Sequence, residues 1–187
     1  MATNREVFDE LWTEVARCHL LYVTIKELFT NVDGLNRHAP SLFAEIQRCM
    51  SAMLFMQITH LCDNDSRSLT FQALLDRLQL PDGELRDRAE KAIVTFKAAC
   101  KPLIAHRNKL FAHNDLKVAL GEKELEPMLR GHLLDAIHEA LPVVKALAVA
   151  QGFDVDYGLP PAYETSRQAR EIAEAMAAMK ELPGKPE

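Results

Sequence analysis

The sequence is poor in the features that mark β-sheets and membrane spans. Only 7 of its 187 residues are glycine, and aromatic residues make up 6%. No segment alternates apolar and polar residues over a sustained run, which argues against a half-buried β-sheet. No apolar run approaches the roughly 18 residues that a transmembrane helix needs, so we expect no membrane partner. These absences favour a soluble, all-helical chain.

Cysteine is also scarce and widely spread. Cys18, Cys49, Cys62 and Cys100 form no C-x-x-C pair, and each lies in an apolar stretch. We therefore expect reduced, buried thiols and a cytoplasmic location. The N-terminus lacks the apolar segment of a signal peptide, which agrees with that location. There is no glycine-rich phosphate loop and no Ser or Cys nucleophile constellation.

What the sequence does contain is apolar residues repeating at spacings of three and four, which predicts amphipathic helices. We expect an all-α, up-and-down bundle over residues 1–152, followed over 153–187 by a linker and a C-terminal amphipathic helix. The first expected helix runs from a Thr3–Glu6 capping box to a stop at 31–34, the second from Pro40 to about Cys62, and the third over 69–80. The fourth runs from about Asp82 through Leu103, and the fifth from Glu126–Pro127 to Gly152. The last begins at a second capping box, Thr165–Gln168.

Two features of these helices leave alternatives open. Pro102 either kinks its helix or restarts it, and Pro142 is expected to bend the next one. The helix from Pro40 is apolar on nearly every side, so it is either central in the bundle or part of a subunit interface. The C-terminal stripe is the alternative interface, and it consists of Ile172, Met176, Met179 and Leu182.

Positive charge is concentrated in one segment of an acidic protein. The net charge is −5, with 22 basic and 27 acidic residues. Residues 97–117 contain five Lys or Arg and one acid, which leaves 17 basic and 26 acidic residues elsewhere. A local cationic site of this kind can attract phosphate without making the whole surface bind nucleic acid.

The centre of that segment is Arg107-Asn108-Lys109-Leu110-Phe111-Ala112-His113. The string resembles the motif of the HEPN superfamily, an Arg followed by a polar residue and then by a His, and its wider context resembles the abortive-infection branch. The resemblance implies a helical bundle and a metal-independent endoribonuclease without a cofactor, of a toxin–antitoxin or phage-defence type. RNA, a second copy of the chain and an antitoxin protein are the partners it implies.

The resemblance also implies roles for individual residues. His113 would be the general acid or base, Arg107 would bind the scissile phosphate, and Asn108 would orient one of them. Secondary contacts with RNA are expected from Lys109, His106, Lys101 and Lys117. In an ideal helix Arg107 and His113 lie roughly 120° apart around the axis, so one copy of the motif makes a poor site. We therefore expect a composite site across a homodimer.

Other interpretations of these residues stay open. Arg107 and His113 could simply favour the negative end of a helix. The chain could also be a non-catalytic HEPN module that binds RNA, a nucleotide or a protein, or a purely structural bundle. We expect no metal site at His132, Asp135, His138 and Glu139, and no calcium loop at 63–65. His60 and Cys62 are expected at the edge of the core.

Overall fold

The protein is a bundle of helices in every part of the chain that its structure, a computed structural model, describes. Those parts are residues 2–29, 39–63, 67–108, 130–153 and 163–178. The all-α prediction is confirmed, because every element in these ranges is a helix. The elements are α1 (Asn4–Leu28), α3 (Pro40–His60), α4 (Phe71–Leu78), α5 (Glu84–Arg107), α7 (Arg130–Ala150) and α8 (Tyr163–Ala178).

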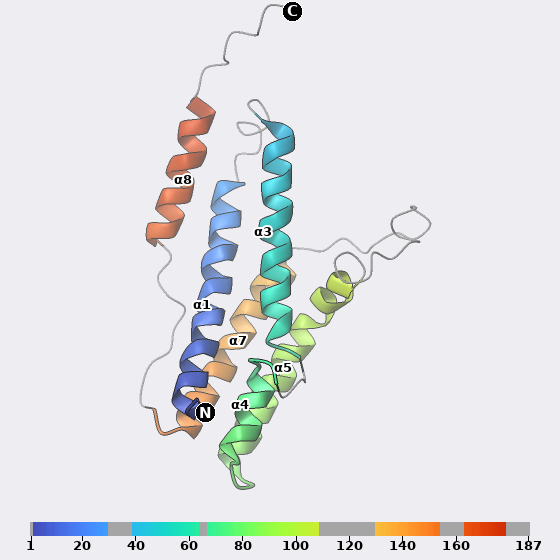
Figure 1. Ribbon diagram of the computed structural model, residues 1–187, viewed down its shortest axis with the longest axis vertical. Coiled ribbons are helices and arrows are strands. Elements are labelled where there is room, and N and C mark those ends of the chain that lie inside the picture. Colours follow the sequence, from blue (N-terminus) through green and yellow to red (C-terminus); the bar gives the residue numbers. More distant parts are fainter. Residues whose placement is uncertain (1, 30–38, 64–66, 109–129, 154–162, 179–187) are drawn as a thin grey trace, which may run out of the picture.

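The four long helices α1, α3, α5 and α7 alternate in direction, and α5 packs most extensively against α7 (Figure 1). The short helix α4 contacts α1 and α5 at one end of the bundle, and α8 lies beside α1. One apolar core joins α1, α3, α4, α5 and α7, and its largest fully buried side chains include Phe8, Phe71, Phe96, Leu54 and Ile137.

Several local signals act as the sequence predicts. The Thr3 hydroxyl accepts a hydrogen bond from the backbone N–H of Glu6, and the Glu6 carboxylate accepts one from the N–H of Thr3. Gly152 ends α7 with a φ of 72°, which glycine adopts without steric cost. The N–H groups of Gly152 and Phe153 then donate to carbonyls of the last helical turn.

Other signals were wrong. Thr165 does not cap α8, because that helix already begins at Tyr163. The apolar spacing of α5 predicts that Leu85 shares a face with Ile93 and Phe96, yet Leu85 is 46% exposed whereas those two are buried. Cys49 is exposed, whereas the other three thiols are buried as expected. The helix α5 continues through Pro102 without a restart, and the proline lies on its exposed side, where water can solvate the carbonyl left without a donor.

The helix α3 has two different halves. Its C-terminal half is in the core through Leu54, Phe55 and Ile58. Its N-terminal half extends beyond the ends of α5 and α7 in Figure 1, and Leu42 is 58% exposed there. Even in the C-terminal half, Met53 is 50% exposed. The prediction that α3 is central therefore holds for one half of the helix only.

The helix α8 is joined to α1 by small residues and one ion pair. Ala169 and Ala173 are buried, and Arg170 Nε lies 3.4 Å from Glu27 Oε2 of α1. Ile172, from the predicted C-terminal stripe, is 53% exposed. The division of the chain at residues 152 and 153 stays a prediction.

Some predicted features fall outside the described residues. They are the stop at 31–34, the start at Glu126–Pro127, the linker after Phe153, and Met179 and Leu182. Within the described ranges, no helix is long and apolar enough to cross a membrane.

The half-buried His19 of α1 makes the stability of the bundle sensitive to acid. Burial is the main cause that lowers the pKa of His19, and the nearby His138 of α7 lowers it further. Protonation is then less favourable in the folded state, so the unfolded state binds more protons as the pH falls through about 6.5. We expect the free energy of unfolding to decrease below that pH, and less so in His19→Gln.

Urea titrations between pH 7.5 and 5 measure this difference between the wild type and the variant. His138→Gln is the matched comparison, because it removes the smaller of the two causes that lower the pKa of His19 and leaves the His19 side chain buried. If acid lowered the free energy of unfolding equally in the wild type and in His19→Gln, His19 would not be the residue responsible.

Candidate functional site

Arg107 occupies the last turn of α5 and is held there by α3. Its Nη1 nitrogen donates a hydrogen bond of 3.2 Å to the Thr59 hydroxyl, and its Nε donates one of 3.2 Å to Asn108 Oδ1. Thr59 is completely buried, and its hydroxyl donates in turn to the Phe55 carbonyl at 2.6 Å. The guanidinium group is thus fixed by a short polar chain, and its side chain is only 18% exposed.

The carboxylate of Asp63 lies between two basic side chains. Its Oδ1 is 3.7 Å from Arg107 Nη1, and its Oδ2 is 3.4 Å from His60 Nδ1. His60 ends α3 and Arg107 ends α5, so both basic groups stand at helix C-termini, where the partial charge is negative and favours cations. The structure therefore brings together three ionisable groups from two helix ends.

These groups open onto a surface pocket of about 500 Å³. Its lining combines the two basic side chains with two carboxylates and a few apolar groups from α1, α3 and the segment before α4: Glu14, Met56, Gln57, His60, Leu61, Asp63, Leu69 and Arg107. Among the described residues, Nη1 and Nε of Arg107 have hydrogen-bond partners and Nη2 has none.

The other predicted site residues are divided between the described and the masked parts of the chain. His106 is half-buried and stacks on Phe55 of α3, with ring centroids 6.3 Å apart. Lys101 is exposed on α5, two turns before Arg107. Lys109, His113 and Lys117 lie outside the described residues, as do Asn114 and Asp115. The structure thus brings Arg107 and Asn108 together and leaves the position of His113 a prediction.

Sequence reasoning missed Thr59, His60 and Asp63 as parts of this site. His60 was expected at the core edge, yet its side chain is 49% exposed. The available signal was the His-x-x-Asp spacing at the end of an apolar helix, because residues three apart lie on one helical face. That spacing alone did not indicate that Arg107, more than 40 residues away, would meet both side chains.

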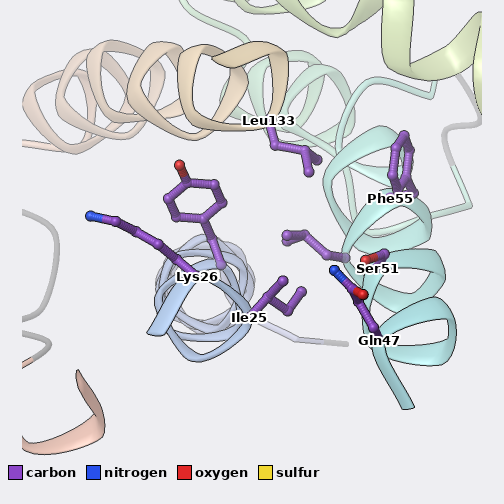
Figure 2. Close-up of a pocket in the computed structure, with 8 residues that line it drawn as sticks. Ile25, Lys26, Gln47, Ser51, Phe55 and Leu133 are labelled. Carbon is purple, nitrogen blue, oxygen red and sulfur yellow. The ribbon is translucent and has the colours of Figure 1, made fainter. Parts of the chain in front are cut away.

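A second, smaller cavity of about 180 Å³ lies between α1, α3 and α7. Figure 2 shows Ile25 and Lys26 on α1, Gln47, Ser51 and Phe55 on α3, and Leu133 on α7 around it. Its lining is mainly apolar. It offers no basic group beyond Lys26, so it does not suit a phosphate as the first pocket does.

Thiol and metal chemistry find little support in the described residues. Burial, with Glu14 adding to it, raises the pKa of the Cys18 thiol to about 12. A hydrogen bond with Cys62, together with burial, raises the pKa of Cys100 as well. Both thiols stay protonated and unreactive near neutral pH. No group of three His, Cys, Asp or Glu side chains suited to a metal occurs in the described ranges.

Comparison with known proteins places this site in a family. The model of the AbiU2 family, a HEPN family, matches residues 4–175. The chain belongs to the HEPN AbiU2 family. The match spans all of the helices except the last residues of α8, and it confirms the resemblance to the abortive-infection branch of the HEPN superfamily. No curated protein and no solved structure gave a match.

The contact between Arg107 and Thr59 predicts an energetic coupling that can be measured in this HEPN AbiU2 protein. Arg107→Met and Thr59→Val each remove one partner and keep most of the side-chain volume. A hydrogen bond to a charged group contributes roughly 1.5–3 kcal/mol. We expect the double variant to be less destabilised than the sum of the single variants, with a coupling of about 1 kcal/mol or more.

Urea unfolding of the four proteins in the cycle gives this number. Thr95→Val is the matched control, because Thr95 is an exposed threonine of α5 whose hydroxyl donates to the Lys91 carbonyl of the preceding turn. Additive effects of Arg107→Met and Thr59→Val would show that the guanidinium is not held as described.

Proposed function

We propose that this HEPN AbiU2 protein is a metal-independent endoribonuclease of a toxin–antitoxin or phage-defence type, with a composite active site between two copies of the chain. The observation that carries the proposal is the fixed guanidinium of Arg107 in the lining of a pocket, within the string that resembles the HEPN motif. Arg107, Asn108 and His113 are its proposed functional residues.

The proposed reaction needs no metal ion. The ribose 2′-hydroxyl attacks the adjacent phosphorus, the bond to the 5′-oxygen breaks, and a cyclic phosphate and a 5′-hydroxyl remain. Arg107 Nη2 would donate to a non-bridging phosphate oxygen and stabilise the charge that develops there. An imidazole suits the proton transfers because it titrates near neutral pH, which is the basis for assigning His113 as acid or base.

The geometry of the motif supports a composite site. Arg107 and His113 lie roughly 120° apart around the axis of an ideal helix, so one copy of the motif presents the two groups poorly to one phosphate. A second copy would supply its own Arg107 and His113 to the shared site.

The exposed face of α3 supports a specific dimer. The residues on this face follow spacings of four, three, four, three and four, which is the pattern of a coiled-coil seam, and all but His60 are apolar: Leu42, Ile46, Cys49, Met53, Met56 and His60. The seam is about 27 Å long. Leu42, Met53 and Met56 are 58%, 50% and 47% exposed, and exposed apolar side chains of this kind mark an interface.

The direction of packing follows from the site. Met56 and His60 end the seam and also line the Arg107 pocket. Two copies of α3 packed in parallel would bring both pockets to the same end of the dimer, whereas antiparallel packing would separate them by the length of the seam. The composite site therefore requires the parallel arrangement.

The first test is cleavage of RNA by purified protein in the presence of EDTA. We expect products that end in a 2′,3′-cyclic phosphate. His113→Ala should lower the rate by about 10²–10⁴-fold, the usual contribution of a general acid or base. Arg107→Ala should lower it by about 10²–10³-fold, through loss of charge stabilisation.

His138→Ala is the matched control for the histidine variant, since His138 is exposed on α7. Cleavage that depends on added metal, or that persists in His113→Ala, would overturn the proposal. Salt-sensitive binding of RNA without any product would support the second candidate, a non-catalytic HEPN module. The overall charge of −5 favours that candidate, because it limits non-specific binding to RNA.

The second test uses Cys49, the one exposed cysteine of the four. In parallel packing the two Cys49 residues face each other across the seam, at a separation that permits a disulfide. We expect mild oxidation to produce a covalent dimer of the native protein. Met53→Glu should prevent it, because two like charges would be buried at the seam.

Cys49→Ser controls for the other thiols, which are buried. Glu174→Ala serves as a surface control on α8, away from the seam. A monomer in sedimentation, or a dimer that never cross-links through Cys49, would overturn this interface. A chain that is monomeric alone and binds a second protein through this face of α3 would indicate that an antitoxin occupies the face.

A further inference from the structure

The site contains a histidine to which the motif assigns no role. His60 ends α3, lines the Arg107 pocket and has a side chain that is 49% exposed. Unlike His113, it does not belong to the Arg-Asn-x4-His segment; the fold brings it to Arg107 from 47 residues away. An accessible imidazole beside a fixed guanidinium is a group that phosphate chemistry can use.

Asp63 lies beside this imidazole. Its Oδ2 is 3.4 Å from Nδ1 of His60, a distance that favours the tautomer with its proton on Nδ1. Nε2 is then the nitrogen that carries the free lone pair and can accept a proton from a substrate. A carboxylate on one side of an imidazole also stabilises the imidazolium that forms when the other nitrogen accepts that proton.

The same carboxylate links the imidazole to the phosphate-binding group. Asp63 Oδ1 is 3.7 Å from Arg107 Nη1, so one carboxylate lies within ion-pair distance of both His60 and Arg107. The charged groups that line the pocket together with His60 are Asp63, just after the end of α3, Arg107 from α5 and Glu14 from α1.

We infer that His60 is a second proton-transfer residue, the general base that removes the 2′-hydroxyl proton, and that Asp63 is its positioning residue. The inference rests on the proposed ribonuclease function. In the reaction His60 Nε2 takes the proton from the 2′-oxygen, the bond from that oxygen to phosphorus forms, and the bond to the 5′-oxygen breaks. The imidazolium of His113 gives its proton to the departing 5′-oxygen.

The pairing of Asp63 with a general base accounts for a carboxylate so close to the phosphate-binding Arg107. For phosphate binding alone Asp63 is unfavourable, because it competes for the guanidinium and repels the ligand. As the partner of a base it is favourable, since it fixes the tautomer of His60 and stabilises the charged product of the proton transfer.

The experiment measures cleavage of a single-site RNA by wild type, His60→Ala, Asp63→Asn and His138→Ala. We expect His60→Ala to lose about 10²–10⁴-fold in rate and to recover part of it when free imidazole is added. Asp63→Asn should lose less and should gain nothing from imidazole, because its own imidazole is still present. His138→Ala should stay within twofold of wild type.

A second substrate separates the base from the acid. Replacement of the 5′-bridging oxygen by sulfur provides a leaving group that departs without protonation. His113→Ala should then approach the wild-type rate, whereas His60→Ala should stay slow. Thermal unfolding and the Cys49 cross-link, measured on every variant, show whether a loss reflects the fold or the dimer.

The outcomes distinguish this inference from the function on which it rests. Wild type that cleaves RNA together with His60→Ala at a similar rate would overturn the role of His60 and leave the ribonuclease intact. Recovery of His60→Ala on the sulfur substrate would overturn its assignment as base. Wild type that leaves RNA uncut would overturn both the ribonuclease and the role of His60.

Discussion

The contact of Arg107 with Thr59 and Asp63 connects two helix ends that are far apart in the sequence. It fixes the C-terminus of α5 against the C-terminus of α3, at distances of 3.2 and 3.7 Å. Helix C-termini carry partial negative charge, so their meeting would be unfavourable without a basic side chain between them. The guanidinium of Arg107 supplies that charge. The site therefore also stabilises the packing of α3 against α5, and these contacts hold its groups in place without a ligand.

The helix α3 links the core to the surface that we assign to the dimer. Leu54, Phe55 and Ile58 face the core, while the opposite side of the same helix carries the exposed seam that ends at His60. Phe55 lies under His106, and Thr59 holds Arg107, so packing of this helix also sets the motif. A change in the packing of α3 would therefore alter the core, the pocket and the seam at the same time.

The sequence predicted elements well where local chemistry decides them. The capping box at Thr3 and the glycine stop at Gly152 act as expected, because each depends on hydrogen bonds within one turn. Prediction from the sequence failed where tertiary packing decides whether a side chain is buried. Cys49 and Leu85 fit the apolar spacing of their helices and are nevertheless exposed, because none of the described helices covers them. Thr165 resembles a cap, but α8 begins two residues earlier.

By itself the sequence determined the helical class, the string at Arg107 that resembles the HEPN motif and the concentration of positive charge around it. These depend on neighbours within a few residues, where periodicity and spacing carry the information. Only the tertiary structure decided that Thr59 and Asp63 contact Arg107, that His60 lines the same pocket, and which side of α3 the described helices leave exposed. Such contacts join segments more than 40 residues apart, and they follow from how the helices pack rather than from any local pattern.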